Sequence, residues 1–244
     1  MKALLKREFF ILRHNFIPYL CILALMPMAI YICISYPMHT LIKTHSSGIN
    51  YLHWSSIGNM IFSSSVIGYL ISLKLTLRYT EETNFSHAML ASPISNMQHL
   101  LSILIWSSIV SFIQLLFSVV ITQSLNSSLS TIDILWTILY LLPIIFYCSA
   151  SGILIALLGL NSIVRTFITV LFVVFFISTT GLFIPIDFAS ISIFNYSPLH
   201  LTILQIQNIV TKDPSSPSPS IIVFVISILV FIISLIMSHR VFKS

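Results

Sequence analysis

The chain has 244 residues, of which 57% are hydrophobic and only 7% are charged. In an ordinary soluble domain roughly a quarter of the residues are charged. A soluble fold this rich in apolar side chains would leave large hydrophobic patches exposed to water. The composition therefore argues against a soluble protein and favours one that lies in a lipid bilayer.

The apolar residues occur in blocks of about twenty, the length that an α-helix needs to cross a hydrocarbon core of ~30 Å. A transmembrane β-barrel would show short alternating segments instead, whereas the block 164–184 is continuously hydrophobic. We therefore predict an all-α polytopic membrane protein, with one transmembrane domain over residues 1–244. Its six predicted spans are 16–36, 55–75, 99–122, 131–158, 165–185 and 219–238.

Before the first span, residues 1–15 predict an amphipathic helix that lies in the membrane interface. Its apolar side chains recur at helical spacing, beside basic side chains that would face anionic headgroups. The apolar stripe is Leu5, Phe9, Leu12 and Phe16, and the neighbouring cations are Lys2, Lys6 and Arg13. A membrane anchor with no further role is enough to explain any one of these residues.

Local signals mark the starts of two spans. The sequences Ser-Asn-Met-Gln at 95–98 and Ser-Thr-Ile-Asp at 130–133 have the form of a capping box. Within the apolar blocks, Pro18, Pro27 and Pro143 are expected to allow kinks, because neighbouring helices can satisfy the carbonyls that a proline frees.

The connection after the second span, residues 76–98, is long and polar. Thr83 can cap a short helix that ends before Pro93, because the residue before a proline avoids the α region. With the acidic pair Glu81 and Glu82 leading into it, such a helix suits docking into a groove of a cytosolic partner. Its apolar edge would consist of Phe85, Met89 and Leu90. A solvated loop resting on the headgroups is the alternative.

The connection before the sixth span, residues 186–218, is too long for a plain turn and too apolar to sit free in water. Pro185 and Pro198 prevent one continuous spanning helix. Backbone at membrane depth must be helical or buried in protein, so we predict short re-entrant helices that form an apolar outer gate. The gate residues are Phe183, Pro185, Pro198, Leu199, Ile203, Ile206 and Val210. A surface helix resting on the bilayer is the alternative.

Lys and Arg are distributed unevenly between the two predicted sides of the membrane. With the N-terminus inside, nine lie on the cytoplasmic side and two outside, as the positive-inside rule requires. The inner set is Lys2, Lys6, Arg7, Arg13, Lys74, Arg78, Arg165, Arg240 and Lys243, and the outer set is Lys43 and Lys212. Both termini are therefore predicted to be cytoplasmic, and the formal charge of +5 gives no reason to expect a nucleic-acid partner.

The predicted spans lack the ionisable groups that chemistry or ion coupling would need. Every Asp, Glu and His maps to a span end or a loop, whereas ion-coupled carriers keep such groups near the midplane. No P-loop sequence occurs, and Cys21, Cys33 and Cys148 show no metal-ligand spacing. We therefore predict no catalytic residue, no metal site and no enzymatic activity in this chain.

Several spans carry Ser and Thr, which either line a pathway or hydrogen-bond between packed helices. The second role is the more common one in membrane proteins. The residues in question are Ser107, Ser108, Ser111, Ser178, Thr179 and Thr180.

Three short motifs, in this order on this topology, resemble one family. Residues 90–95, Leu-Ala-Ser-Pro-Ile-Ser, resemble the signature of the first intracellular coupling segment in ATP-binding-cassette (ABC) type-2 permeases. Residues 181–186, Gly-Leu-Phe-Ile-Pro-Ile, and 195–199, Asn-Tyr-Ser-Pro-Leu, resemble that family's Gly-x-x-x-Pro and downstream Asn-Pro patterns. Over essentially its whole length, the chain is similar to the six-span membrane subunits of bacterial ABC exporters.

The resemblance implies a permease subunit of an exporter in the bacterial plasma membrane, paired with a second copy or a similar permease. ATP and Mg²⁺ would be bound by a separate ABC ATPase subunit, so this chain would hold no cofactor itself. The ATPase-coupling residues would be Glu81, Glu82, Phe85, His87, Met89, Leu90, Ser92 and Pro93. The alternatives are a non-transporting membrane scaffold that recruits a cytosolic protein and, less favoured, a secondary carrier.

Overall fold

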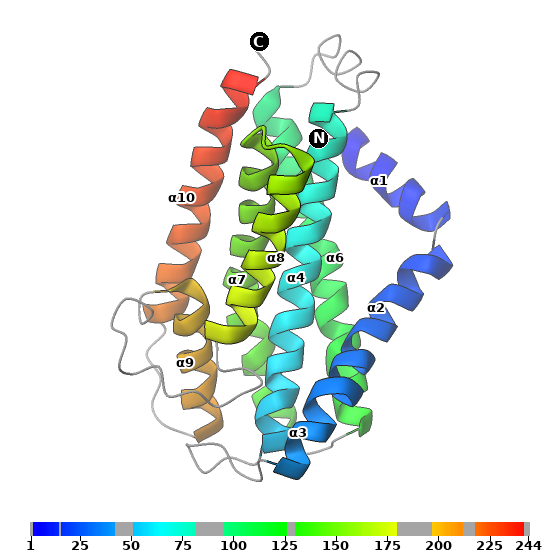
Figure 1. Ribbon diagram of the computed structural model, residues 1–244, viewed down its shortest axis with the longest axis vertical. Helices are drawn as coiled ribbons and strands as arrows, with labels where there is room; N and C mark the ends of the chain where they lie inside the picture. Colours follow the sequence, from blue (N-terminus) through cyan, green and yellow to red (C-terminus); the bar gives the residue numbers. More distant parts are fainter. Residues whose placement is uncertain are drawn as a thin grey trace.

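The computed structural model describes residues 2–14, 16–41, 51–81, 95–125, 130–179, 197–211 and 218–241. Within these ranges the chain is helical, with short turns and no strand. Most of the helices run side by side as an antiparallel bundle, and both chain termini lie at the same end (Figure 1). The all-α prediction is confirmed for the described residues.

The helices are short at the start of the chain and long in its middle. In chain order they are α1 (Lys2–His14), α2 (Phe16–Ile30), the π-helical turn η1 (Tyr31–Ser35), α3 (Tyr36–Leu41), α4 (Tyr51–Glu81), α6 (Asn96–Leu125), α7 (Thr131–Leu157), α8 (Ser162–Thr179), α9 (Pro198–Thr211) and α10 (Ser218–Val241). Because α2, η1 and α3 follow one another without a break, they form one continuous helical stretch. α1 precedes this stretch as a separate helix at an angle to it (Figure 1).

Five stretches among the described residues are long and apolar enough to cross a membrane, which indicates a membrane protein. They are Phe16–Leu41, Trp54–Thr80, Asn96–Leu125, Thr131–Leu157 and Pro219–Ser238, and they match five of the predicted spans. The remaining predicted span, 165–185, corresponds to α8, whose apolar stretch Ser162–Val174 is shorter. Residues 180–185 lie outside the described ranges, so the count of six stays a prediction.

Serine side chains cap the N-terminal ends of two of the spanning helices. At the start of α7, Ser130 Oγ accepts a hydrogen bond from the backbone N–H of Asp133 at 3.2 Å and donates one to Asp133 Oδ2 at 2.6 Å. At the start of α6, Ser95 Oγ accepts one from the backbone N–H of Gln98 at 3.3 Å. Both sites predicted as capping motifs are therefore helix caps.

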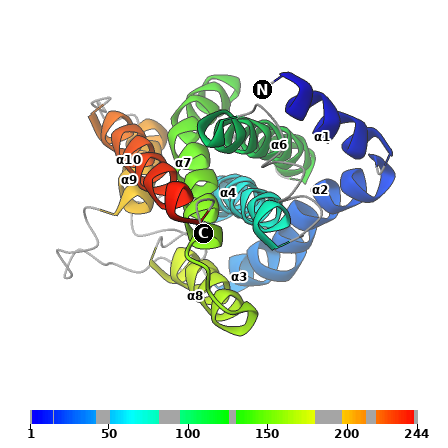
Figure 2. The same cartoon turned by 90° about the horizontal axis from the view of Figure 1, so that it is seen from above.

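Helix α4 is the centre of the bundle, with α2, α6, α7 and α8 around it (Figure 2). Three of its aromatic side chains, Tyr51, Trp54 and Tyr69, are among the largest fully buried ones. Tyr69 stacks on Phe172 of α8 with ring centroids 4.5 Å apart, and its hydroxyl lies 3.2 Å from Thr169 Oγ1. These contacts hold α8 against α4.

The helices around α4 approach it closely because small residues line the contacts. A methyl group added at Gly152 of α7 would collide with Ser72 Oγ and with the backbone carbonyl of Tyr69 on α4. One added at Gly68 of α4 would lie 3.0 Å from Ser111 Oγ on α6. Small side chains at these positions let helix backbones pack closely, as is typical between transmembrane helices.

Most serines of α6 face the protein interior. Ser111 Oγ donates to the backbone carbonyl of Ser64 on α4, and Ser63 Oγ donates to Ser118 Oγ at 3.2 Å. Ser107 and Ser108 are buried as well. For these α6 residues, hydrogen bonding and packing between helices is the interpretation that the contacts favour. The side chains of residues 178–180 lie outside the described ones.

Two prolines inside spanning helices receive a hydrogen bond from a neighbouring helix. Asn59 Nδ2 of α4 donates to the backbone carbonyl of Pro27 at 2.8 Å, just before the π-helical turn η1. Ser227 Oγ of α10 lies 3.2 Å from the carbonyl oxygen of Pro143 in α7. In both places a polar side chain of a neighbouring helix bonds to a proline's own carbonyl and links the two helices, whereas the carbonyl that a proline leaves without its helical donor lies four residues earlier.

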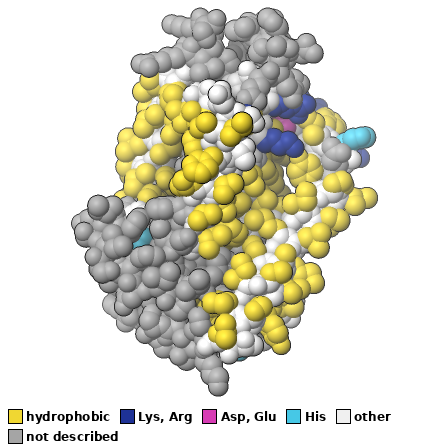
Figure 3. All heavy atoms as spheres, viewed as in Figure 1, with side chains coloured by type: hydrophobic (Ala, Val, Ile, Leu, Met, Phe, Trp, Pro, Cys, Tyr) yellow, Lys and Arg dark blue, Asp and Glu magenta, His cyan; other side chains and the backbone are white. Residues whose placement is uncertain are grey.

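The outer surface of the bundle is largely apolar. Hydrophobic atoms cover much of the described part of the face shown in Figure 3, and its Lys and Arg side chains gather toward the end that carries the termini. On α8, Ile163 is 84% exposed and Phe167 is 64% exposed. Side chains of this kind in such numbers suit contact with lipid rather than water.

We expect Gly152→Ala to destabilise the bundle by about 1–3 kcal/mol, the usual cost of overpacking. The added methyl group meets the backbone of α4, which cannot rotate away as a side chain can. Unfolding of the purified protein in detergent would measure the change. As a control, Leu139→Phe adds bulk to an exposed position of the same helix and should leave stability within about 0.5 kcal/mol. Equal stabilities of both variants would contradict the close contact.

Candidate functional site

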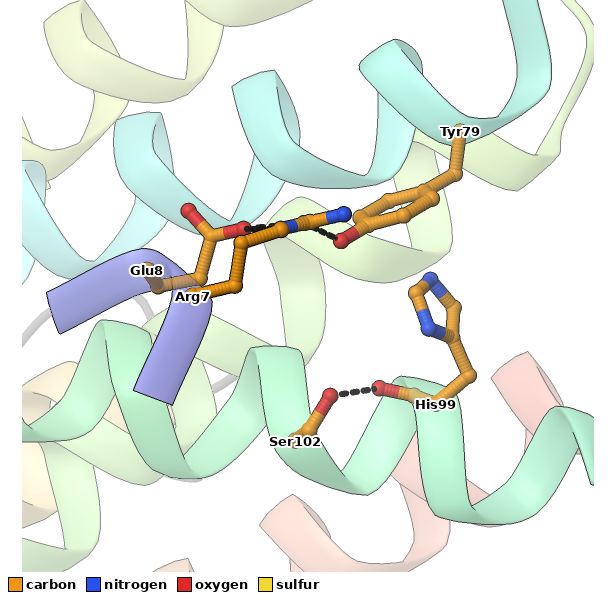
Figure 4. A network of polar contacts seen from close by, with 5 residues as sticks. All are labelled: Arg7, Glu8, Tyr79, His99 and Ser102. Atoms are coloured by element: carbon orange, nitrogen blue, oxygen red, sulfur yellow. Dashed lines mark hydrogen bonds and ion pairs between the residues drawn. The ribbon is translucent and has the colours of Figure 1, made fainter. Parts of the chain in front are cut away.

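A cluster of polar side chains joins α1 to the ends of α4 and α6 (Figure 4). We call it the joint. Its members are Arg7 and Glu8 from α1, Tyr79 from the last turn of α4, and His99 and Ser102 from the start of α6.

Arg7 is the centre of the joint. Its Nε donates to Glu8 Oε1 at 3.1 Å, and its terminal nitrogen contacts both that carboxylate and the hydroxyl of Tyr79. The guanidinium carbon also lies 5.3 Å from the centroid of the Tyr79 ring, a cation–π distance. One cation therefore binds a residue of its own helix and a residue 72 positions away in the sequence.

The charges of this pair are partly shielded from solvent. Glu8 is only 8% exposed, and a buried carboxylate is costly unless a cation and hydrogen bonds satisfy it. Burial alone would lower the pKa of the Arg7 guanidinium, but its hydrogen bond to Glu8 and its interactions with Tyr79 raise the pKa above the usual value. Arg7 is therefore always available as the cation that Glu8 requires.

His99 contributes packing rather than hydrogen bonds to the joint. Its ring is 1% exposed and meets the ring of Tyr79 at an interplanar angle of 79°, with centroids 3.9 Å apart. Among the residues that the structure describes, neither ring nitrogen has a hydrogen-bond partner. Ser102 Oγ donates to the backbone carbonyl of His99 at 2.7 Å, within the same helix. The imidazole is thus held by its contact with the tyrosine.

Residues of the joint lie near both ends of the predicted coupling segment. Tyr79 lies two residues before the end of α4, and His99 lies three residues after the start of α6. Their ring contact holds the two ends of the segment together, and Arg7 binds α1 to the same place. A force applied to the segment would therefore reach α1, α4 and α6 at once.

The joint is a linkage between helices. Its carboxylate and its guanidinium are already paired, and no three His, Cys, Asp or Glu side chains in the described ranges come together to hold a metal ion. What the geometry offers is a fixed contact between three helices at one end of the bundle.

A cavity of about 810 Å³ opens beside the joint, between α1, α2, α4 and α6. We call it the groove. Glu8, Lys74 and Arg78 line it together with apolar side chains that include Ile71 and Val110. The groove therefore combines charge with a hydrophobic wall.

Most of the predicted coupling residues fall on a part of the chain that the structure leaves undescribed. Glu81 is the last residue of α4. Outside the described ranges lie Glu82, Phe85, His87, Met89, Leu90, Ser92 and Pro93. Their contact with a partner stays a prediction.

The predicted gate residues fall partly on α9. Pro198 begins this helix, and the apolar stripe of Leu199, Ile203 and Ile206 is at most 5% exposed, because α9 packs against α7 and α10. Val210 belongs to the same helix, but its side chain lies outside the described ones. Phe183 and Pro185 also lie outside the described ranges. The apolar stripe is thus buried against α7 and α10, and its role as a gate stays a prediction.

Sequence reasoning missed the joint. It assigned the cations of α1 to lipid headgroups and predicted no partner for Glu8. One signal was available: Glu8 is the sole acidic residue among the first 80, and it sits in a predicted helix whose other charged residues are basic. A lone carboxylate beside an arginine on a membrane-facing helix points to a buried partner.

Comparison with known proteins assigns the chain to no family. No family model, no curated protein and no solved structure matches it.

The structure makes a specific prediction about charge pairing in the joint. Arg7→Ala leaves the buried Glu8 without its cation and should weaken the docking of α1 by about 2 kcal/mol, which corresponds to about thirtyfold faster trypsin cleavage after Arg13. The double variant Arg7→Ala/Glu8→Ala removes both charges and should be cleaved more slowly than the single variant.

Lys6→Ala is the matched control, because Lys6 is exposed and lies over the ring of Phe10, 5.8 Å from its centroid, rather than in the joint. Its cleavage rate should stay within about twofold of the wild-type rate. If the double variant is cleaved as fast as Arg7→Ala or faster, the pairing account is wrong.

Proposed function

We propose that this chain is the membrane-spanning permease subunit of an ATP-driven exporter of the ABC type-2 class. The observation that carries the proposal is the joint, which ties α1 to both ends of the predicted coupling segment. An exporter subunit needs such a connection, because ATP hydrolysis on a separate protein must move helices that lie in the membrane. The motifs at 90–95, 181–186 and 195–199 support the same conclusion.

In this proposal the permease crosses the membrane six times, with α8 as part of the fifth span and α9 as part of a re-entrant segment. The end of the bundle that carries the termini faces the bacterial cytoplasm. That orientation is supported by the Lys and Arg side chains of the described face, which gather toward that end of the bundle (Figure 3). α1 then lies in the cytoplasmic interface of the membrane.

The proposed coupling step begins outside this chain. An ABC ATPase subunit binds ATP and Mg²⁺ and docks on residues 81–93 from the cytoplasm. When it closes on ATP, it pushes the segment, and the contact of Tyr79 with His99 makes α4 and α6 move together. Because α4 is the centre of the bundle, its displacement shifts α7 and α8 with it. Two permeases, identical or similar, would enclose the substrate pathway between them.

In the proposed mechanism the apolar stripe of α9 seals the outer end of the pathway at rest. Leu199, Ile203 and Ile206 are buried against α7 and α10, so α9 can move only by its separation from those helices. ATP-driven movement of the bundle would provide that separation. An apolar pathway with few fixed charges suits an amphipathic or hydrophobic cargo better than a small ion.

Of the two alternative functions, the secondary carrier fits the described residues less well. A secondary carrier needs an ionisable group at membrane depth, yet in the described spans Asp133 is the sole carboxylate and it lies in the first turn of α7. A non-transporting scaffold would use the same segment to recruit a cytosolic protein. It differs from the exporter in one measurable respect, since its partner need not hydrolyse ATP.

Affinity purification of the tagged full-length chain from its native membranes tests the proposal. We expect an ATP-hydrolysing subunit to copurify, and Phe85→Ala or Glu82→Arg to lower its yield at least tenfold without changing the amount of inserted permease. The reason is that Phe85 supplies apolar contact and Glu82 charge to the docking segment. Phe167→Ala is the control, because Phe167 is exposed on α8, far in sequence from that segment.

Recovery of no nucleotide-binding protein from the wild type would contradict the exporter proposal. Recovery of a partner without ATPase activity would favour the scaffold instead.

A further inference from the structure

We propose that the groove between α1, α2, α4 and α6 binds the headgroup of an anionic phospholipid from the leaflet on the side of the chain termini. This inference goes beyond the proposed function and does not depend on it, since it concerns one chain and no partner.

The charges that line the groove favour an anion. Lys74 and Arg78 both face it and lie four residues apart on α4, so they are neighbours on one helix face. They place two positive side chains on this wall of the groove, and basic pockets of this kind attract anionic headgroups. Glu8, the carboxylate of the groove, is already paired with Arg7. In the described part of the chain no ion pair involves Lys74.

The level of Lys74 in the membrane matches a phospholipid headgroup. Lys74 lies six residues before the end of the stretch Trp54–Thr80, which is about 9 Å along a helix. That stretch, at about 40 Å, is as long as a bilayer with its headgroups is thick. An exposed lysine at this depth lies near the boundary between phosphates and acyl chains, where long basic side chains reach toward the interface.

The remaining walls of the groove suit the apolar part of a lipid. Leu12, Ile71, Trp106 and Val110 line it and also belong to one hydrophobic cluster between α1, α2, α4 and α6. Tyr19, three residues into the span Phe16–Leu41, adds an amphipathic ring of the kind that is common at the membrane interface. A free phosphate ion would leave this apolar wall unused, whereas a phospholipid covers it with acyl chain. Basic pockets between membrane helices on the cytoplasmic side bind anionic lipid headgroups in the same way.

Native mass spectrometry of the full-length chain in a neutral detergent tests the inference. We expect phosphatidylglycerol to bind at least tenfold more tightly than phosphatidylcholine with the same acyl chains. Lys74→Gln and Arg78→Gln should each weaken phosphatidylglycerol binding about fivefold, the effect of ~1 kcal/mol per cation near a membrane surface. Arg13→Gln is the matched control, because Arg13 is an exposed cation of α1 that does not line the groove.

A second variant tests the groove without altering charge. Ile71→Trp fills the space between α4 and the neighbouring helices and should also weaken phosphatidylglycerol binding, while Arg13→Gln binds as the wild type does. Inorganic phosphate at millimolar concentration should not displace the lipid. The inference is overturned if both lipids bind the wild type equally, if Lys74→Gln, Arg78→Gln and Ile71→Trp all behave like Arg13→Gln, or if phosphate alone competes effectively.

Discussion

The position of α1 depends on a carboxylate that must keep its cation. Glu8 is buried, and Arg7 neutralises it while also reaching the hydroxyl and the ring of Tyr79 on α4. Without this interaction α1 would be held mainly by a few apolar contacts at the edge of the bundle. The groove has α1 as one wall, and the predicted coupling segment has Tyr79 at one end. Both proposals therefore rest on the same polar contact.

The close packing inside the bundle explains why a displacement of one helix at its end would also displace the neighbouring helices. Gly152 lets α7 touch the backbone of α4, and Ser111 bonds to a carbonyl of α4 from α6. Close-packed helices with hydrogen bonds between them resist sliding one by one. In an exporter, displacement of α4 would carry its neighbours along, so a small push at the segment would become a rearrangement of the whole bundle. The apolar outer surface offers little resistance, because lipid is fluid.

Composition and periodicity were enough to predict the helices and five of the spans, because continuous hydrophobic blocks of bilayer length are typical of membrane-spanning helices. The serine caps at 95 and 130 and the buried stripe of α9 also followed from local pattern. The joint could not be predicted from local pattern. Arg7 and Tyr79 are 72 residues apart, and no local pattern encodes which helices pack together. The predicted apolar stripe of α1 does not share one environment. Leu12 packs into the bundle, whereas Phe9 and Phe16 are exposed.

Hydrogen exchange of α1 in the proposed complex of this chain with an ATPase tests the central claim most directly. Amide protection of α1 should change when the ATPase is trapped with ATP, together with that of the ends of α4 and α6, because the joint links them. In Arg7→Ala the ends of α4 and α6 should still respond while α1 no longer does. An α1 that shows no change on trapping in the wild type, although the ends of α4 and α6 respond, would contradict the account.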